Sequence, residues 1–310
     1  MKRNTRVKPD LYQVVTHRLL QLIEAGTPPW VRAYNRRGPA RNYATGHVYT
    51  GINAFVLNYF ADHPHPFYLT YKQAQDLGGQ VRKGAKSEPV FFFNTMYKDA
   101  DGRGVPAAQV ATRRAAGQDL TAIPMPRKFA VFNVADVDGI DFDLPPLLPV
   151  TGEPLAAGEQ LLASLHDVPP IFHTDPNGAY YRPQLDAINV PPVENFLTGH
   201  HYYSTLFHEI IHATGAGHRL NRPGITQPID QRRPGSPLHA QEELIAEIGA
   251  AFLSARAGLN SPALHENTAS YLAGYLNLLR NDKRAIFRAA AAAQKAIDYL
   301  TAQPGTPPPE

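Results

Sequence analysis

The sequence contains no cysteine and no long apolar run, and each absence excludes a class of protein. Without cysteine the chain forms neither disulfides nor thiolate metal sites, so any metal ion must be held by His, Asp or Glu. No window approaches the roughly 18 apolar residues of a membrane span. The first residues, MKRNTRVKPDLYQ, also lack the apolar stretch of a signal peptide. We therefore expect a cytoplasmic protein with no membrane partner.

Charged residues are scarce, at 18% of 310, whereas hydrophobic residues reach 43%, which is enough for a sizeable core. The length favours two domains. Residues 1–150 carry 19 Lys and Arg against 12 Asp and Glu, and residues 151–310 carry 11 against 15. A basic half joined to a mildly acidic half indicates contact with nucleic acid, and chance variation of the surface is the alternative.

A stretch rich in Pro and Gly divides the chain. We expect an α+β fold made of four parts: an N-terminal α+β domain (1–145), a linker (146–158), a mainly helical domain (159–302) and a disordered tail (303–310). In the first domain the apolar pattern predicts helices over 10–25 and 50–60, a short helix after Thr70, and strands over 89–97 and 128–134. About 30 residues without clear periodicity separate the two strands, too many for an ordinary hairpin loop.

The second domain is expected to combine helices with a small antiparallel sheet. A helix over 159–166 precedes a β-rich stretch in which residues 175–178, DPNG, are typical of a hairpin turn. Four helical patterns follow, over 200–214, 240–257, 263–280 and 283–301.

Residues 208–212 read HEIIH, an HExxH motif. On a helix, residues four apart share a face, so His208 and His212 can hold one cation. Glu209 can then reach a water molecule at the metal and act as general base. The alternative is two histidines that are four apart by chance.

A second helix supplies carboxylates. Glu243 and Glu247 are four apart beside an apolar face, an unfavourable arrangement without a nearby cation. We expect one of them to bind the metal and the other to orient a ligating histidine by a hydrogen bond. Two His and one Glu form the ligand set of hydrolytic zinc sites. A solvated acidic helix face is the alternative.

The remaining candidates near the motif are weaker. We expect four histidines to be surface or capping residues: His200, His201, His218 and His239. Four tyrosines could stabilise an oxyanion, although packing is the expected role: Tyr180, Tyr181, Tyr202 and Tyr203. Residues 179–190 could form an edge strand against which an extended peptide substrate lies.

The N-terminal half interleaves basic and aromatic side chains, as single-strand-binding proteins do when bases stack and phosphates pair with cations. The first cluster comprises Trp30, Arg32, Tyr34, Arg36, Arg37, Arg41, Tyr43 and Tyr49. The second comprises Lys72, Arg82, Lys83 and Lys86. An ordinary basic surface with Trp30 in the core is the alternative.

Several phrases resemble a known family in both wording and order. TPPW, RNYATGHVYTGIN, FYLTYKQAQDLGGQVRKGAKSEPV and AVFNVADVDGID resemble the N-terminal domain of ArdC-type antirestriction proteins, which is shared with TraC-type primases. AYYRPQLDAINVPP, YYSTLFHEIIHATGAGHRLNR, AQEELIAEIGAAFL and DKRAIFRAAAAAQKAIDYL resemble that family's zincin-like metallopeptidase domain. The resemblance covers roughly residues 8–301.

The resemblance implies a protein of mobile elements that binds single-stranded DNA and protects incoming DNA from host restriction. It places the metal on His208, His212 and Glu243, with Glu209 as the base, because in related proteases the first acid of an E-x-x-x-D/E pattern is the ligand. The family usually has a second Pro-Trp pair where this sequence reads VRAYNRRG. One stacking platform is then missing unless Tyr34 substitutes for it.

Together these observations predict a DNA-binding zinc metallopeptidase that protects incoming DNA, with double-stranded DNA and an unidentified protein substrate as further partners. Two alternatives remain. The protein could coat DNA and use zinc only structurally, or it could be a DNA-damage or regulatory protease that cleaves a DNA-associated protein.

Overall fold

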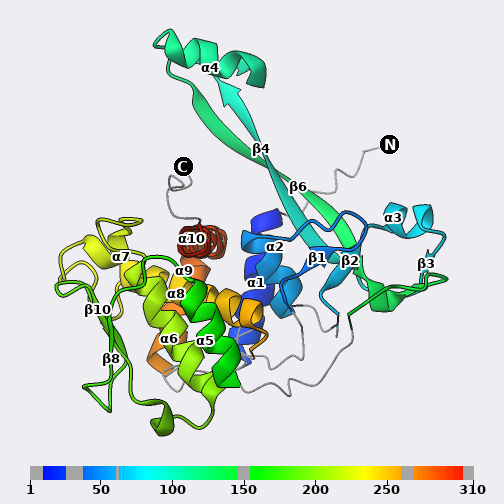
Figure 1. Ribbon diagram of the computed structural model, residues 1–310. Helices are drawn as coiled ribbons and strands as arrows, with labels where there is room; N and C mark the ends of the chain where they lie inside the picture. The colour runs from blue at the N-terminus through cyan, green and yellow to red at the C-terminus, as the bar shows by residue number, and fades with distance from the viewer. Residues whose placement is uncertain are drawn as a thin grey trace.

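The computed structural model describes residues 10–25, 38–60, 63, 65–145, 154–259 and 269–302, and its fold is α+β as predicted (Figure 1). The elements before the predicted boundary are α1 (Leu11–Glu24), β1 (Arg41–Asn42), α2 (Gly51–Phe55), the π-helix η2 (Val56–Phe60), β2 (Phe67–Leu69), α3 (Tyr71–Asp76), β3 (Gln80–Val81), β4 (Glu88–Lys98), β5 (Gly104–Val105), α4 (Ala107–Ala115), β6 (Thr121–Asn133), η3 (Val134–Asp136) and β7 (Val137–Asp138). None of the described helices is long and apolar enough to cross a bilayer.

After the boundary the chain is mainly helical. Its elements are α5 (Pro154–Ser164), β8 (Ile171–Phe172), β9 (Tyr180–Arg182), β10 (Ala187–Asn189), η4 (Val193–Asn195), α6 (Gly199–Ala213), α7 (Pro223–Thr226), α8 (Pro237–Ala257), α9 (Ala269–Asn281) and α10 (Ala285–Leu300). Helix α5 begins at Pro154, within the predicted linker. The predicted tail, 303–310, lies outside the described residues.

The N-terminal sheet has the strand order β1-β2-β6-β4-β5. Strands β4 and β6 pair antiparallel from Glu88 opposite Val131 to Lys98 opposite Thr121, and this ribbon projects from the body with α4 at its far end (Figure 1). The two predicted strands are present, but the second begins at Thr121, well before the predicted residue 128. Because the outer ribbon is exposed on both faces, its sequence lacks the alternation that marks a half-buried strand.

One face of the ribbon carries an apolar strip. Phe92 is 48% exposed, Met125 48% and Phe129 46%. The register places Phe92 opposite Arg127, and the rings of Phe92 and Phe129 meet edge to face with centroids 5.3 Å apart. Nothing else in the described chain contributes a ring contact to this pair.

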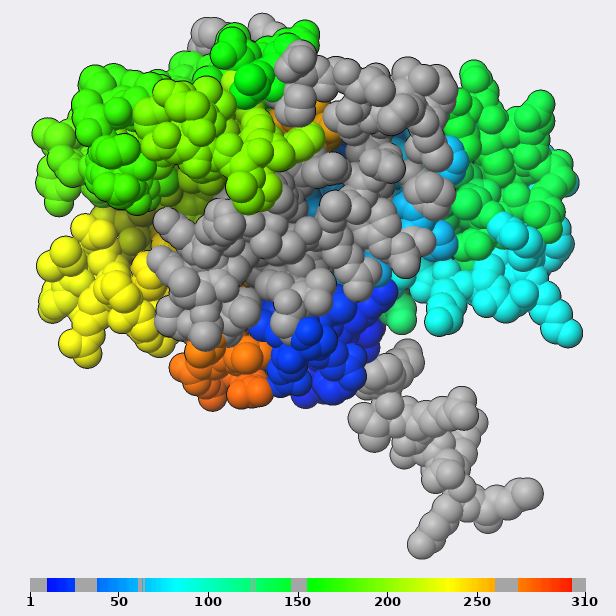
Figure 2. Space-filling view, turned by 90° about the horizontal axis from the view of Figure 1, so that it is seen from below, coloured from blue at the N-terminus to red at the C-terminus, as the bar shows by residue number. Residues whose placement is uncertain are grey.

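The main apolar core crosses the predicted domain boundary. Buried residues of α1 and α2 belong to the same cluster as those of α6, α8 and α10. Phe287 of α10 contacts Tyr12 at 4.8 Å and Phe91 at 5.7 Å between ring centroids, and Tyr59 stacks on Phe252 at 6.5 Å. Helix α1 lies beside α9, the blue and orange surfaces of Figure 2. The N-terminal half therefore completes the core of the helical half.

The small C-terminal sheet is mixed and not antiparallel as predicted. Its order is β8-β10-β9, with β10 parallel to β8 and antiparallel to β9. Residues 175–178 join β8 to β9, which are not neighbours, so the predicted hairpin turn at DPNG is wrong. The loop instead wraps around Asn189, whose Oδ1 accepts hydrogen bonds from the Thr174 and Asp175 N–H groups and whose Nδ2 donates to Gly178 O.

Candidate metal centre

The HExxH motif lies on α6, a helix with a local start signal and a buried face. Thr198 is the N-cap, and its side chain accepts a hydrogen bond from His201 N–H. His208, Glu209 and His212 are 8%, 6% and 8% exposed. The sequence thus folds the motif into a helix whose polar side chains face the protein interior.

Helix α8 brings the carboxylates to α6. Ser236 caps it, Pro237 occupies the first turn, and Gly258 ends it in the left-handed conformation with φ 69°. A Cβ at Gly249 would lie 2.6 Å from Cγ1 of Ile211, so this glycine permits the close approach of α8 to α6. That approach places Glu243 beside both histidines of the motif.

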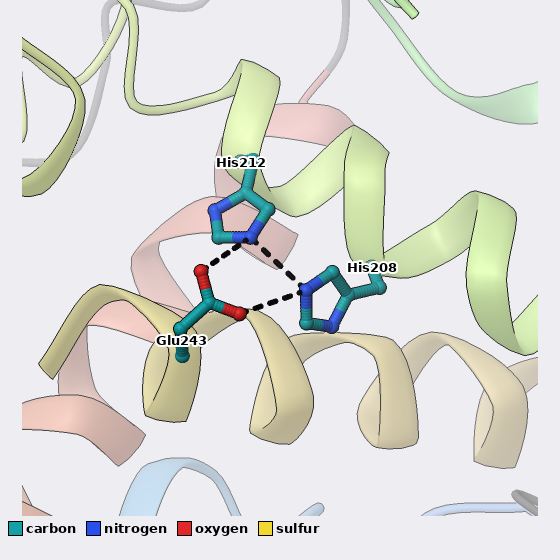
Figure 3. Close-up of side chains that lie close together, drawn as sticks. All are labelled: His208, His212 and Glu243. Carbon is teal, nitrogen blue, oxygen red and sulfur yellow. Dashed lines mark hydrogen bonds and ion pairs between the residues drawn. The ribbon is translucent and has the colours of Figure 1, made fainter. Parts of the chain in front are cut away.

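Three ligand atoms converge between the two helices (Figure 3). His208 Nε2 and His212 Nε2 are 3.0 Å apart, and the Glu243 oxygens lie 3.4 Å from the first and 3.5 Å from the second. Ligands of a tetrahedral zinc ion at 2.0–2.1 Å are separated by about 3.3 Å. Two imidazoles and a carboxylate at these separations fit a metal ion such as zinc.

Glu209 points from the same helix toward the small sheet. Its Oε2 accepts a hydrogen bond from Tyr181 N–H of β9 at 2.7 Å. Burial raises the pKa of Glu209, although the nearby histidines oppose this. A carboxylate with a raised pKa next to a metal site is suited to accept and return a proton.

Glu242 contacts a ligating histidine from outside the cluster. Its Oε1 lies 3.2 Å from His212 Nδ1, and the carboxylate pairs with Arg222. We predicted a role of this kind for Glu247, which is buried on α8 one turn after Glu243, and that assignment stays a prediction. Glu242 and Glu243 are adjacent and therefore point about 100° apart on α8, so that Glu243 can face the metal side of the His212 ring while Glu242 faces its other side.

The acidic groups are held charged although they are buried. Burial alone would raise the pKa of Glu242, but the charge of Arg222 and the hydrogen bonds from His212 and Arg222 lower it to about 2. Burial likewise would lower the pKa of His212, but Glu243 and Glu242 place it well above its ordinary 6.5 in the metal-free protein. The cluster attracts a cation, whether a proton or a metal ion.

A second buried arginine braces the sheet beside α6. Arg219, whose side chain is 2% exposed, donates to both oxygens of Asp186 at 2.7 and 2.9 Å and to Asp167 at 2.9 Å. Tyr181 OH also donates to Asp186, at 2.8 Å. The strand that holds Glu209 is therefore fixed to the end of the metal helix.

The other histidines and tyrosines lie outside the triad. His218 is 3.4 Å from Asp186, His201 bonds Thr198, and His239 lies 3.6 Å from Glu243 across one turn of α8. Tyr203 is buried against Gly158, where a Cβ would lie 2.3 Å from the ring. Residues 179–190, predicted to form one edge strand, contain two strands instead. Strand β9 is at the edge of the sheet, whereas β10 lies in its middle.

The predicted DNA-contacting residues are spread over the N-terminal part. Trp30, Arg32, Tyr34, Arg36 and Arg37 lie outside the described residues. Four basic side chains are exposed around α3 and β3: Lys72, Arg82, Lys83 and Lys86. Arg82 is partly neutralised by Asp136 and Asp138, at 3.7 and 3.6 Å.

The aromatic residues of the first cluster are largely packed. Tyr49 is 4% exposed in the core of the sheet. Tyr43 packs between Phe67 and Phe142, with centroids 6.1 and 4.9 Å away, and Arg41 lies over the Phe67 ring at 6.0 Å. A buried ring such as Tyr49 has no face free for a base.

Comparison with known proteins covers both halves of the chain. Residues 9–132 match the N-terminal domain of the anti-restriction factor ArdC, and residues 159–292 match a zincin-like metallopeptidase family. An uncharacterized protein of Sinorhizobium fredii, y4eC, is 33% identical over 97% of this chain and 94% of its own. Two DNA primases named TraC from Escherichia coli are 34% and 33% identical over 96% of this chain, which spans only 27% and 20% of their length.

Two crystal structures of the antirestriction protein ArdC of plasmid R388 have the same fold. The metal-free structure has a TM-score of 0.70 and 35% identity, covering 94% of this chain and 96% of that one. The Mn(II)-bound structure has a TM-score of 0.67 and 34% identity, covering 94% and 97%. A metal ion has thus been seen in a relative that shares nearly the whole chain.

Proposed function

This chain belongs to the ArdC-type antirestriction family, and from that premise we propose that it is a DNA-binding zinc metallopeptidase of a mobile element. Its N-terminal half (1–145) would bind single-stranded DNA, and its helical half (159–302) would cleave a protein that acts on the incoming DNA in the cytoplasm. The convergence of His208, His212 and Glu243 is the observation that carries the proposal, because it places a hydrolytic ligand set beside a buried carboxylate.

The residues divide the chemistry as follows. His208, His212 and Glu243 hold the metal, which when bound polarises the scissile carbonyl and acidifies water. Glu209 accepts the proton of the attacking water and returns it to the leaving amine. Tyr181 N–H donates to Glu209 and keeps the carboxylate in one orientation. The outer edge of β9, next to α6, is the place for an extended peptide.

For DNA, the proposal relies on charge. Lys72, Lys83 and Lys86 are exposed on or near α3 and β3 and can contact phosphates. We retain Trp30, Arg32, Tyr34, Arg36 and Arg37 as stacking and phosphate-binding residues, together with the partly exposed Arg41 and Tyr43. The single strand is the preferred form because stacking requires unpaired bases.

A DNA-transfer assay tests the function. Glu209→Gln removes the base but keeps the side-chain shape, and Glu194→Gln on the exposed η4 is the matched control. We expect Glu209→Gln to abolish protection while the purified protein still binds metal and DNA, and Glu194→Gln to protect normally. Normal protection by Glu209→Gln would instead favour a protein that coats DNA.

The DNA arm of the test uses a second variant. Replacing Lys72, Lys83 and Lys86 by Ala should weaken single-strand binding and flatten its salt dependence by about 0.7 per lost phosphate contact. Lys295→Ala, on the exposed side of α10, is the control and should bind normally. If the cleaved protein proves to be a DNA-repair or regulatory factor, protection is incidental to the activity.

A further inference from the structure

We propose that Arg222, acting through Glu242, is a positioning residue for the metal site. The pair holds the His212 ring in the tautomer and orientation that present Nε2 to the metal. The inference rests on the proposed function, since it concerns the same site.

Glu242 joins Arg222 to His212. Arg222 donates from Nη2 to Oε1 at 2.7 Å and from Nε to both oxygens, at 3.2 and 3.0 Å. The same Oε1 lies 3.2 Å from His212 Nδ1. Glu242 is 3% exposed and Arg222 7%, so water does not compete for these bonds.

The other end of Arg222 is fixed to the metal helix. Nη2 donates to Ile211 O at 2.6 Å, and Nη1 donates to Thr214 Oγ1 at 2.7 Å. Both acceptors flank His212 at the end of α6. One guanidinium therefore connects the backbone next to the ligand with the carboxylate that touches its ring.

Two glycines leave room for the pair. A Cβ at Gly215 would lie 2.9 Å from Arg222 Nη2, and a Cβ at Gly224 would lie 2.4 Å from Glu242 Cβ. These separations are shorter than side-chain contacts normally allow. The surrounding chain is shaped around Arg222 and Glu242 on both sides.

The chemistry follows from donors and acceptors. A carboxylate that faces a guanidinium offers only acceptors, so the His212 nitrogen next to it must carry the hydrogen. The lone pair is then on Nε2, the atom that faces His208 and Glu243. Partners of this kind typically change metal affinity 10- to 100-fold.

The two ligating histidines differ in this respect. His208 Nδ1 is buried and has no hydrogen-bond partner among the described residues. Of the two ligating histidines, only His212 has a charged partner among the described residues at its Nδ1, the ring nitrogen that faces away from the other ligands. Loss of the network should therefore affect one ligand and leave the other in place.

A merely structural role would look different. Arg222 could serve only to satisfy the carbonyl groups at the end of α6, and breaking a buried ion pair destabilises a protein in any case. Replacing both partners by apolar residues removes the uncompensated charge and often restores stability. If the carboxylate of Glu242 orients His212, the same double replacement restores stability but does not restore the affinity for the metal.

The experiment compares Arg222→Met, Glu242→Gln and the double variant Arg222→Met/Glu242→Leu in the full chain. Zinc and Mn²⁺ affinities are measured by chelator competition, the geometry by the visible spectrum of Co²⁺, and stability by melting of the metal-free protein. The control is the pair Arg18–Glu88, remote from the metal site in the N-terminal half and joined at 2.8 Å, changed to Met and Leu.

We expect a 10- to 100-fold loss of affinity and an altered Co²⁺ spectrum in all three variants, while the double variant melts close to wild type. The control should keep wild-type affinity. Wild-type affinity in the double variant, or an equal loss in the control, would overturn the positioning role and leave the proposed function standing. If the wild-type chain itself binds none of these metals, it is the proposed function that fails.

Discussion

The metal centre and the β4–β6 ribbon are held in opposite ways. Around the metal site, Arg219 and Arg222 are almost fully buried, and each bonds groups from two or more segments of the chain. Along the outer ribbon, Phe92 and Met125 are about half exposed, and pairing between the two strands is the main support. A site that must fix ligands within fractions of an ångström needs several independent supports, whereas a projecting arm needs only its own ladder.

Removing a ligand should have the largest effect and defines which side chains belong to the centre. His208→Ala, His212→Ala and Glu243→Ala should each abolish stoichiometric zinc binding, since two remaining ligands do not hold the ion. Glu209→Gln should retain it. Metal analysis of the purified variants decides this, and zinc retained by Glu243→Ala but lost by Glu247→Ala would reverse our choice of ligand.

Acid should release the metal next. In the metal-free protein the pKa values of His208 and His212 are both raised above 6.5, because carboxylates outweigh burial. Protons therefore begin to compete with the metal for the imidazole nitrogens at a pH above 6.5. For each proton displaced, the metal affinity should fall about tenfold per pH unit as the solution is acidified. The increase in melting temperature caused by zinc should shrink as pH falls. An increase that stays constant from about pH 8 to about pH 5.5 would contradict the raised pKa values.

Without metal, the stability of the protein should depend on pH in the opposite direction and increase as the pH falls. A histidine whose pKa is raised by folding stabilises the folded protein at pH values below its unfolded pKa. This stabilisation is lost as the pH rises through the folded pKa. Melting the protein in chelator across the same pH range separates this contribution from metal loss.

Arg219 gives a prediction for the bracing network. Arg219→Ala removes the ion pairs with Asp186 and Asp167. Because both carboxylates are 36% exposed and can be solvated, the loss should be about 1–3 kcal/mol of unfolding free energy. Denaturant unfolding measures it. Arg182→Ala, an exposed arginine on the same sheet, is the control and should change stability by less than about 1 kcal/mol. Similar losses in both variants would remove the distinction between buried and exposed support.

The contact between α6 and α8 can be tested at one methyl group. Gly249→Ala places a carbon 2.6 Å from Ile211 and should destabilise the chain by about 1–3 kcal/mol and weaken zinc binding. Gly274→Ala in α9 meets its nearest neighbour at 3.8 Å and should stabilise by about 0.5–1 kcal/mol. Equal signs for these two substitutions would mean that α8 does not need the close approach.

The ribbon should give the smallest effect. Replacing residues 99–120, which include β5 and α4, with a short turn should change the free energy of unfolding by less than about 1 kcal/mol, because few buried groups are lost. Thermal melting of the shortened protein measures this. A large loss would show that the arm supports the body.

Local patterns made part of this structure readable. The histidines and Glu209 could be predicted because helical spacing alone puts them on neighbouring positions of one helix, and Thr70 correctly marked the start of α3 through a capping box with Gln73. The α+β class also followed from the apolar pattern.

Long-range contacts could not be predicted in the same way. Arg222 lies in a polar loop 20 residues before Glu242, and no spacing rule relates the two. The i,i+4 rule led us to choose Glu247 without considering Glu242, because it selects pairs on one helix and ignores which face the partner helix presents. Asn189 organises the 174–178 loop from a strand 14 residues away. This contact is not visible in the local DPNG pattern, which therefore wrongly predicted a hairpin turn.

The contacts of Phe287 with Tyr12 and Phe91 bear on how such a chain is inherited. Since each half buries apolar surface of the other, a recombination event between them would produce a hybrid with mismatched side chains in its centre. The two TraC primases align with 96% of the chain, although it spans about a quarter or less of their length. The shared core gives a physical reason for the two halves to occur together in these longer relatives.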